Sequence, residues 1–585
     1  MLFAHPPVID FNDPLPDAGP LRVLKTNSRK VVTLEIGEFI ARETIWSDPA
    51  TGQLYPSASL RGLVAPGCNY GYDVLVQVGR ALFLDAQPVR QIIAQLAAAH
   101  VHLSASAVAE LGRRFIILLA LAHRQCAGQL KEAMTLQGGY ILHLDATYED
   151  KSPLLMTGID AVMEIVLGNV KLPSEKAAGI VPFLRQLNTS FGPPLALVHD
   201  MSKGILSAIQ EVFPGVPDFI CHFHFLRDLG KDLLGDDYDI VRKRLQVHGA
   251  AGALRARLRV WQKKIDADPP LLQALQELPT GGLPTQPLQQ APLLAAYLLA
   301  HWVLAGSQEG QGYGFPFDRP LRALARRALE VCEHLENLKT LRLSDSWPDN
   351  LPFHHLSLDL RKLADDRALE HALDRLETDC PIFDQMRQAL QIAPITPASQ
   401  GLNHDGEKVE MNKLQLQVNG FLAQIRARPD FPATPRYQKM IEQIVRYDSK
   451  LFAAPLVVST PQGPRSIQPQ RTNNLMERFF RDFKRDCRRK TGAQALGRTL
   501  RTMLADTPLV KNLKNPAYLK ILLNGQPTLE VLFAQIDPAT VRKELKIASQ
   551  NPEKVPHALK QFIAKLNSPD PIHNFIKSLK SNRIS

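Results

Sequence analysis

Cysteine is scarce in this chain, since 585 residues hold only six. The six are scattered, and no two of them form a Cys-x-x-Cys pair. A disulfide framework needs closely spaced cysteines in a small chain, and a zinc ribbon needs two such pairs. Both are therefore excluded, and we expect the protein to work in the reducing cytoplasm.

Long apolar runs are also missing. Runs such as 115–123 and 293–305 fall short of the roughly 18 residues that cross a bilayer. The first residues lack a basic start followed by an apolar segment, so no secretory signal is expected. The sequence predicts buried helices and no membrane partner.

The composition excludes disorder as the main theme, because 45% of the residues are hydrophobic and 22% are charged. These fractions are ordinary for a globular protein. Since domains typically hold about 100–200 residues, the length predicts three or four structural units.

Positive charge is concentrated at one end of the chain. The net charge is +11, yet residues 471–585 alone hold 22 Lys and Arg against 9 Asp and Glu. Residues 1–470 hold 47 against 49. Phosphate contacts supply most of the sequence-independent affinity for nucleic acids. The distribution therefore favours a polyanion-binding face, and a solvated basic tail is the alternative.

The N-terminal part divides into two regions. Residues 1–75 contain short β-like stretches and predict no particular chemistry. In residues 76–130 apolar side chains recur every three or four positions, which indicates helices.

Two of these helices are separated by a short turn. Residues 88–99 and 105–115 are the helical segments, and Ser104 can cap the second one. Arg113 and Arg114 lie near its end. A helix-turn-helix that contacts DNA and an ordinary helical hairpin both fit this pattern.

Residues 138–230 follow an α/β order. Strand-like segments at 141–149 and 156–170 come first, and helices then alternate with short buried strands. Hairpin strands followed by βαβ crossovers fit a ribonuclease-H-like layer. We predict the first part of such a core here.

The rest of the chain is predicted to be helical. Between residues 231 and 470 the strand signal disappears, and helical segments such as 356–378 alternate with Pro- and Gly-rich breaks. This block predicts a large all-helical insertion. Residues 471–510 are expected to complete the core, and residues 511–585 to form a basic helical C-terminal region.

Two apolar strands carry acids. Asp145 lies in the middle of one, where an unpaired carboxylate is costly unless it faces a cleft or a cation. Asp200 ends the other, which is the usual position of a functional residue in an open α/β sheet. Each acid alone also fits a strand-end cap or a surface charge.

Glu477 lies on a predicted helix with one basic side and one apolar side. At about 100° per residue, the basic side includes Glu477 itself and points the acid into a basic groove. That side carries Arg481, Lys484 and Arg488, and the opposite side carries Phe479, Phe483 and Cys487.

The three acids suit metal-dependent phosphoryl transfer. Two metal ions about 3.5–4 Å apart assist in-line displacement at a phosphodiester. Mg²⁺ prefers carboxylate oxygens, so two Asp and one Glu are a sufficient ligand set. Cys221 and His224 have the spacing of half a zinc site, but no second pair completes the shell. We expect a structural role for them beside the acids.

Together these segments resemble the DDE transposases of bacterial insertion sequences, in the branch similar to Mutator-like transposases. That branch has a first Asp in a strand like LDATYE and a second after a strand ending His-Asp or Ser-Asp. A Cys-x-x-His pair and an Asn-x-x-Glu helix follow. The matching residues are Asp145, Asp200, Cys221, His224, Asn474 and Glu477.

The resemblance covers residues 140–230 and 470–500. It implies phosphodiester hydrolysis at element ends and attack by the freed 3′-hydroxyl on target DNA. It also implies two Mg²⁺ or Mn²⁺ ions bound by the three acids, and terminal inverted repeats and target DNA as partners. A homo-oligomer on DNA and a nucleoid-associated location in the cytoplasm are further implications.

Two other features follow from the resemblance. Related enzymes stabilise a flipped base with a Trp in the insertion, and Trp302 is the base-stacking candidate beside Trp261. Apolar helical patterns around both favour core positions. The N-terminal cysteine-rich zinc module of many relatives is missing, so recognition of element ends would rest on the predicted helix-turn-helix.

Basic side chains are expected to contact DNA phosphates. The candidates are Arg478, Arg481, Lys484, Arg485, Arg488, Arg489, Arg113 and Arg114. Three alternatives stay open: a nuclease of the same fold that never joins strands, a transposase-derived protein that binds DNA without catalysis, and a metal-dependent regulator that uses Cys221 and His224.

Overall fold

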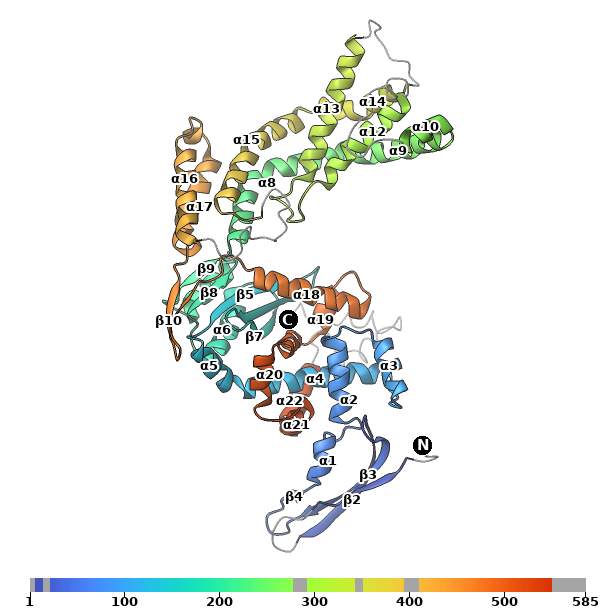
Figure 1. Cartoon of the computed structure of the whole chain (residues 1–585), viewed down its shortest axis with the longest axis vertical. Coiled ribbons are helices and arrows are strands. Elements are labelled where there is room, and N and C mark those ends of the chain that lie inside the picture. The colour runs from blue at the N-terminus through green and yellow to red at the C-terminus, as the bar shows by residue number, and fades with distance from the viewer. Residues whose placement is uncertain (1–5, 14–20, 277–291, 342–350, 394–409, 550–585) are drawn as a thin grey trace, which may run out of the picture.

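The computed structural model describes residues 6–13, 21–276, 292–341, 351–393 and 410–549 (Figure 1). It is a mixed α/β structure, as predicted. Its two largest hydrophobic clusters divide the chain into an α/β core and an arm of helices. Figure 1 shows the arm rising from one side of the core.

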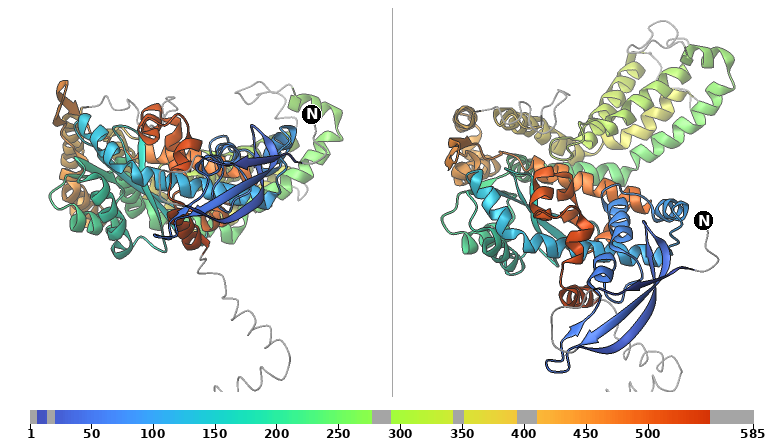
Figure 2. Two further views of the ribbon diagram at one scale, coloured as in Figure 1. Left: turned by 90° about the horizontal axis from the view of Figure 1, so that it is seen from below. Right: turned by 60° about the horizontal axis from the view of Figure 1, so that its bottom comes forward.

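The N-terminal region forms a small sheet with strand order β1-β3-β2, and β4 pairs with β3. Val31 and Phe39 pack on Leu60 in a separate small cluster. In the right-hand view of Figure 2 these strands extend away from the core helices. The elements are β1 (Val8–Phe11), β2 (Arg22–Thr33), β3 (Gly37–Ser47), β4 (Leu54–Tyr55) and α1 (Ala58–Leu63).

Four helices connect this region to the central sheet. They are α2 (Tyr72–Phe83), α3 (Val89–Ala98), α4 (Ala105–Gln125) and α5 (Ala127–Leu136). The helix, turn and second helix predicted from the sequence are therefore present. Ser104 accepts a hydrogen bond from the Ala107 amide at 3.2 Å and caps α4. The second half of α4, around Phe115, lies in the core, so only its first turns can meet DNA, and that role stays a prediction.

The central sheet has the order β7-β6-β5-β8-β9. β5, β6 and β7 are antiparallel neighbours, whereas β8 and β9 run parallel to β5. All seven residues of β6 are buried, so protein covers both of its faces. The elements are β5 (Ile141–Thr147), β6 (Leu154–Asp160), β7 (Ile165–Leu172), α6 (Ala177–Phe191), β8 (Ala196–His199), α7 (Lys203–Val212) and β9 (Asp218–Ile220).

Two glycines let α6 pack closely on the sheet. A Cβ at Gly158 would lie 3.1 Å from the Leu187 side chain, and one at Gly168 would lie 3.1 Å from the same residue. Distances this short would force Leu187 to move. The glycines therefore set the position of the helix over β6 and β7.

The arm begins with the long helix α8, which leaves the sheet directly after β9. Apolar residues from Ile220 to Leu451 form its hydrophobic cluster. Its elements are α8 (His222–His248), α9 (Ala250–Asp266), α10 (Pro269–Gln276), α12 (Pro292–Ala305), η1 (Gly306–Gln308), α13 (Pro320–Leu341), α14 (Pro352–Ala364), α15 (Arg367–Ala389), α16 (Met411–Arg426), η3 (Phe431–Ala433) and α17 (Pro435–Leu451).

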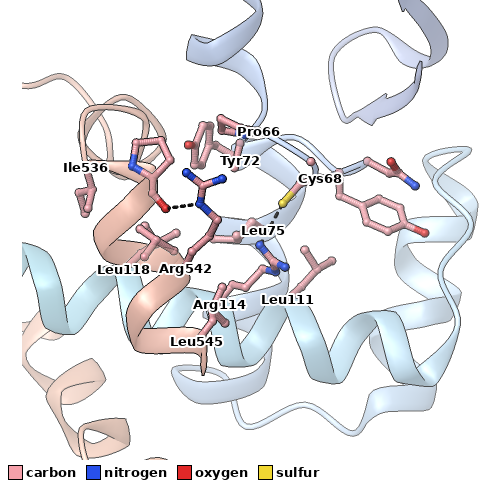
Figure 3. A pocket seen from close by; sticks show the side chains of 16 residues that line it. Pro66, Cys68, Tyr72, Leu75, Leu111, Arg114, Leu118, Ile536, Arg542 and Leu545 are labelled. Atoms are coloured by element: carbon pink, nitrogen blue, oxygen red, sulfur yellow. Dashed lines mark hydrogen bonds between the residues drawn. The ribbon is translucent and has the colours of Figure 1, made fainter. Parts of the chain in front are cut away.

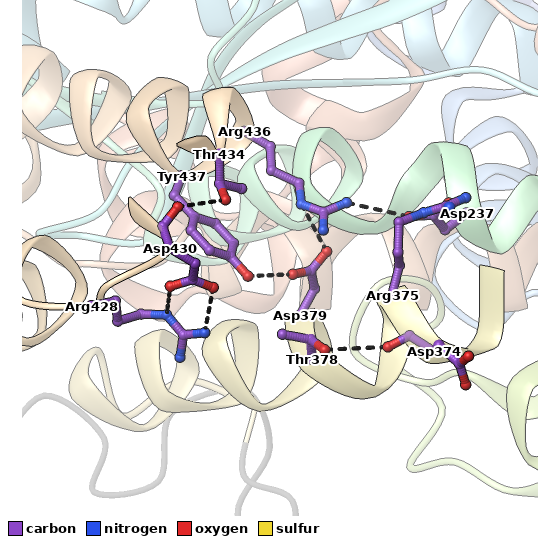
Figure 4. Close-up of polar contacts among 10 residues, drawn as sticks. All are labelled: Asp237, Asp374, Arg375, Thr378, Asp379, Arg428, Asp430, Thr434, Arg436 and Tyr437. Atoms are coloured by element: carbon purple, nitrogen blue, oxygen red, sulfur yellow. Dashed lines mark hydrogen bonds and ion pairs between the residues drawn. The ribbon is translucent and has the colours of Figure 1, made fainter. Parts of the chain in front are cut away.

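A polar network joins three helices of the arm (Figure 4). Asp237 on α8 accepts from Arg375 at 2.8 Å and lies 3.4 Å from Arg436. Arg436 also reaches Asp379 at 3.0 Å, and Tyr437 donates to Asp379 at 2.7 Å. The acids of this network are therefore paired with cations from neighbouring helices.

Two predictions for residues 231–470 are wrong. The helix expected at 356–378 is two helices, α14 and α15. The break lies at Asp366, whose side chain caps the start of α15 by accepting hydrogen bonds from the Ala368 and Leu369 amides. The block is also not helical throughout. A hairpin of β10 (Leu456–Thr460) and β11 (Gly463–Ile467) follows α17.

The hairpin covers part of the central sheet. Leu456 and Ile467 pack against Ile141, Ala196 and Val198. Its strands are short, and Val457 faces solvent, so the sequence shows little of the alternation that marks a strand.

The chain then returns to the core. The remaining elements are α18 (Asn474–Thr491), α19 (Gly497–Thr502), η4 (Thr507–Lys514), α20 (Pro516–Leu523), α21 (Leu529–Ala534) and α22 (Pro538–Ser549). α21 contacts α2, and α22 contacts α4. Residues 511–549 are thus helical as predicted, and residues 550–585 lie outside the described residues. No helix in the described ranges has both the length and the apolarity to cross a membrane.

Candidate active site

A pocket of about 660 Å³ brings together side chains from four parts of the chain. Asp145 comes from β5, Asp200 follows β8, His224 comes from α8 and Glu477 from α18. The three predicted acids therefore line one pocket, although 277 residues of sequence separate the second from the third.

The sheet register explains how the first two acids meet. His143 of β5 pairs with Val198 of β8 in parallel, so Asp145 and Asp200 follow at the same level two residues later. Parallel neighbours carry their carboxyl ends to one edge of a sheet, which is the common place for a ligand site.

Asn473 fixes the start of α18 against the sheet. Its Oδ1 lies 2.9 Å from His143 Nδ1, and its Nδ2 donates to the Leu144 carbonyl at 3.0 Å. Its backbone N–H donates to Cys221 Sγ at 3.2 Å. Since Leu144 precedes the first acid, these bonds set Glu477, one turn into the helix, relative to Asp145.

The structural role predicted for Asn474 stays a prediction. Asn474 is exposed, whereas its neighbour Asn473 is fully buried and makes the contacts that anchor the helix.

Cys221 and His224 are both buried beside the acids. Burial raises the pKa of the Cys221 thiol to about 12 and lowers the pKa of His224 to about 3. Cys221 is held by the Asn473 amide, which supports a structural role. His224 Nδ1 has no hydrogen-bond partner among the described residues.

A second contact chain holds the backbone at Asp200. His199 Nδ1 lies 2.5 Å from the Asp200 carbonyl oxygen, and its Nε2 lies 3.1 Å from Asp218. Lys450 from α17 also contacts Asp218. Burial acts to raise the pKa of Asp218, but hydrogen bonds from His199 and Lys450 lower it to about 2. The acid at the end of β8 is thus tied to the arm.

The pKa values of the three acids are all raised. Burial is the largest cause for Asp145, whose pKa rises to about 8 with further repulsion from Asp200 and Glu477. Burial also raises the pKa of Glu477 to about 7 and that of Asp200 above its ordinary value. Burial, more than repulsion among the acids, therefore disfavours the charged form of all three carboxylates.

The basic side of α18 opens on the same pocket. Arg481, Lys484 and Arg488 line it together with Glu477, as the helical spacing predicts. On the apolar side, Phe483 and Cys487 are buried as expected. Phe479 is only half-buried, and that part of the prediction is wrong, because Met476 and Phe480 fill the core position instead. The apolar stripe turns by one residue at the start of the helix.

Three further basic residues of α18 line a neighbouring hollow of about 720 Å³. It is bordered by Arg478, Arg485 and Arg489. Arg485 lies 3.2 Å from Asp482, and Arg478 lies 3.6 Å from Glu164. The charges of Arg485 and Arg478 are therefore partly offset by neighbouring acids.

Arg113 and Arg114 do not line the pocket of the three acids. Arg113 is exposed on α4. Arg114 borders a pocket of about 210 Å³ between α4, α22 and the loop before α2 (Figure 3). There it donates to Glu110 and, at 3.0 Å, to Cys68 Sγ. The structure thus gives Arg114 an internal role, and its predicted phosphate contact remains a hypothesis.

The two candidate tryptophans differ. Trp261 is 2% exposed and lies in the core of the arm, as its apolar pattern predicts. Trp302 is 39% exposed, so the core position favoured by its pattern is wrong. Arg327 covers its ring, with Cζ 4.9 Å from the ring centroid. Trp302 is the residue of the pair that a base could reach.

The donor set suits a hard divalent cation in its chemistry. Oδ1 of Asp145 accepts from the Ala146 amide at 2.7 Å, and Oδ1 of Asp200 accepts from the Ser202 amide at 3.0 Å. The other oxygen of each accepts no hydrogen bond among the described residues. Within these residues, however, no three His, Cys, Asp or Glu side chains stand close enough together to coordinate an ion. The acids fit the ligand type of Mg²⁺, and their side chains would have to converge to bind it.

Three residues of the site were missed in the sequence. His143 and Asn473 act through long-range contacts that no local pattern reveals. Arg227, on α8, lines the pocket with the acids. Its signal was available, because it continues the three-residue spacing of Cys221 and His224.

Comparisons with known proteins add little to this geometry. No protein-family model matches the chain, and no curated protein matches it. Among solved structures, one similar structure is a Drosophila P element transposase strand transfer complex, with 12% sequence identity and a TM-score of 0.22. The match covers 65% of this chain and 93% of that one. Similarity at this level shows neither the family nor the function of the chain.

Proposed function

We propose that the chain is a DNA transposase of the DDE type. The observation that carries the proposal is the meeting of Asp145, Asp200 and Glu477 in one pocket beneath the basic side of α18. The order of the central sheet, a three-stranded meander followed by two parallel strands, supports a ribonuclease-H-like core. The arm would then be the insertion between the second and third acids.

The chemistry would be in-line displacement at phosphorus. Two Mg²⁺ or Mn²⁺ ions, when bound, would activate the attacking oxygen and stabilise the leaving oxygen. Asp145, Asp200 and Glu477 would hold them. The raised pKa values of the acids favour this assignment, because cations would remove the repulsion among the carboxylates.

The protein's own side chains would position the DNA. Arg481, Lys484 and Arg488 lie along the rim of the pocket and would bind phosphates on either side of the cleaved bond. The other proposed phosphate contacts are Arg478, Arg485, Arg489, Arg113 and Arg114. Trp302 would stack on a displaced base. The proposed partners are the terminal inverted repeats and target DNA, handled by an oligomer.

The test is cleavage of linear DNA that ends in the sequences flanking the gene. With Mg²⁺ the protein should cut at the element ends and join the freed 3′-hydroxyl to a second DNA, and EDTA should stop both steps. Asp145→Asn, Asp200→Asn and Glu477→Gln should each lower cleavage by about 10³-fold or more, because a lost metal ligand removes several kcal/mol of transition-state stabilisation.

Controls separate the possible failures. Glu132→Gln removes an exposed carboxylate on α5 and should cleave like the unaltered protein. DNA binding should survive in the three acid variants. Full cleavage by all three would sink the assignment, and cleavage without joined product from pre-cut ends would point to a nuclease.

A further inference from the structure

Arg227 is a cation of the pocket that lies outside the acid motif and outside the basic side of α18. It comes from α8, three residues after His224 and six after Cys221, so all three share one side of the helix. It lines the pocket with Asp145, Asp200 and Glu477.

The guanidinium of Arg227 forms no hydrogen bond and no ion pair with the described residues. Its Nε is buried and donates no hydrogen bond, and no carboxylate oxygen of the described chain forms an ion pair with it. Its Cζ lies 5.9 Å from the centroid of the Phe223 ring. An unpaired buried donor is costly and calls for a ligand as its explanation.

The position of Arg227 also differs from that of the rim cations. Its charge lowers the pKa of Asp145, of Asp200 and of Glu477, whereas Arg481 acts in this way on Glu477. It shares the pocket with all three acids and forms an ion pair with none of them among the described residues. His224 Nδ1, one turn earlier on the same side, is a second buried nitrogen without a partner.

A phosphate oxygen explains why Arg227 keeps an unpaired donor in a pocket that also holds three acids. A guanidinium presents fixed N–H groups that form strong, charge-assisted hydrogen bonds to a phosphate oxygen. A simple counter-ion for the acids would instead form an ion pair with one of them.

We infer that Arg227 is a catalytic residue that binds a non-bridging oxygen of the phosphate being cleaved. The inference rests on the proposed function. The oxygen of water, or of a 3′-hydroxyl in the joining step, forms a new bond to phosphorus, and the bond from phosphorus to the leaving 3′ oxygen breaks. The nucleophile gives up its proton to solvent, and the leaving oxygen takes one up. Arg227 stays protonated throughout and stabilises the negative charge on the non-bridging oxygens.

Single-turnover cleavage of stereochemically pure phosphorothioates tests this contact. Each isomer replaces one non-bridging oxygen at the cleaved position with sulfur. Arg227→Gln should lower the rate on normal DNA by about 10²-fold or more, as the loss of an oxyanion donor does. For one isomer its defect should be at least about tenfold smaller, because sulfur has already weakened the same contact. Replacing Mg²⁺ with Mn²⁺ should leave that difference in place.

Two variants guard the result against trivial causes. Arg227→Lys keeps the positive charge but lacks the fixed N–H groups of the guanidinium. Its cleavage rate should fall less than that of Arg227→Gln, with the same preference between isomers. Arg481→Gln, at the rim, should mainly weaken DNA affinity and should slow both isomers alike. Arg227→Gln should change DNA affinity by less than about threefold, since one contact among many is lost.

The outcomes are distinct. Cleavage by Arg227→Gln at the unaltered rate, or an equal defect on both isomers, overturns the inference and leaves the proposed function standing. If the unaltered protein cuts no DNA with either metal ion, the proposed function fails and the inference fails with it.

Discussion

In the arm, Asp366 lies against His248 Nε2 at 2.6 Å and also contacts Arg244. Burial acts to raise the pKa of Asp366, but hydrogen bonds from His248 and Arg244 lower it to about 2. In the core pocket, burial and two neighbouring acids raise the pKa of Asp145 to about 8. Both regions bury an aspartate, but its pKa is lowered in the arm and raised in the core pocket.

The difference lies in the partners that each region supplies. The arm provides an Arg or His from a neighbouring helix for its buried acids, as at Asp237 and Asp366. The core pocket contains Asp145, Asp200 and Glu477, and Arg227 in the same pocket forms no ion pair with the described acids. Unbalanced buried charge works against folding, so its presence in a pocket is a sign of function. Paired charge in the arm serves to fix helices.

The largest contrast is expected from neutralising one acid in each region. Asp379→Asn should lower the free energy of unfolding by about 4 kcal/mol, because Arg436 loses one of its two acid partners and Tyr437 loses a charged acceptor. Asp145→Asn should leave this free energy unchanged or raise it, since no cation loses a partner. Urea unfolding of both variants measures the difference.

Equal losses of unfolding free energy in Asp379→Asn and Asp145→Asn would contradict the difference between arm and core. Burial still raises the pKa of Asp379 despite Tyr437 and Arg436, so Asp237→Asn provides a second arm variant. It should also be destabilised, because Arg375 and Arg436 both contact that acid.

A smaller effect is expected where the two regions meet. Asn473→Ala should lower the free energy of unfolding by about 3 kcal/mol, because buried His143 and the Leu144 carbonyl lose their partners. Asn474→Ala, at the exposed neighbour, should stay within about 0.5 kcal/mol of the unaltered protein. Thermal unfolding checks the stability, and DNA cleavage should fall only in Asn473→Ala. A larger loss at Asn474 would contradict the anchoring role of Asn473.

The smallest effect concerns pH. Because the pKa of Asp366 is about 2 in the folded chain against 3.8 ordinarily, its charge stabilises the fold above about pH 4, and this contribution disappears as the pH falls through 2. Asp366→Asn can still cap α15, so at pH 5 it should cost about 2 kcal/mol, which is the charge contribution alone. At pH 3 the cost should be about half as large. A cost that stays constant between these pH values would show that the charge is not responsible.

Local pattern was sufficient for the parts of the fold that depend on neighbours in sequence. The strands around Asp145 and Asp200 and the helix of Glu477 appear where apolar spacing predicts them. The sequence pattern gave wrong predictions where tertiary packing determines the local structure or the exposure of a side chain. The hairpin at 456–467 is too short to show alternation, and Trp302 sits in an apolar helix yet faces solvent.

The sequence by itself determined which acids stand on which elements, because strand and helix periods are local properties of the chain. Only the tertiary structure decided that Asp145, Asp200 and Glu477 share a pocket, since a parallel strand register and the contacts of Asn473 bring distant segments together. It also decided that Arg227 shares this pocket and that its Nε has no hydrogen-bond partner among the described residues. Burial and pairing depend on every element that packs around a side chain, and no single segment contains that information.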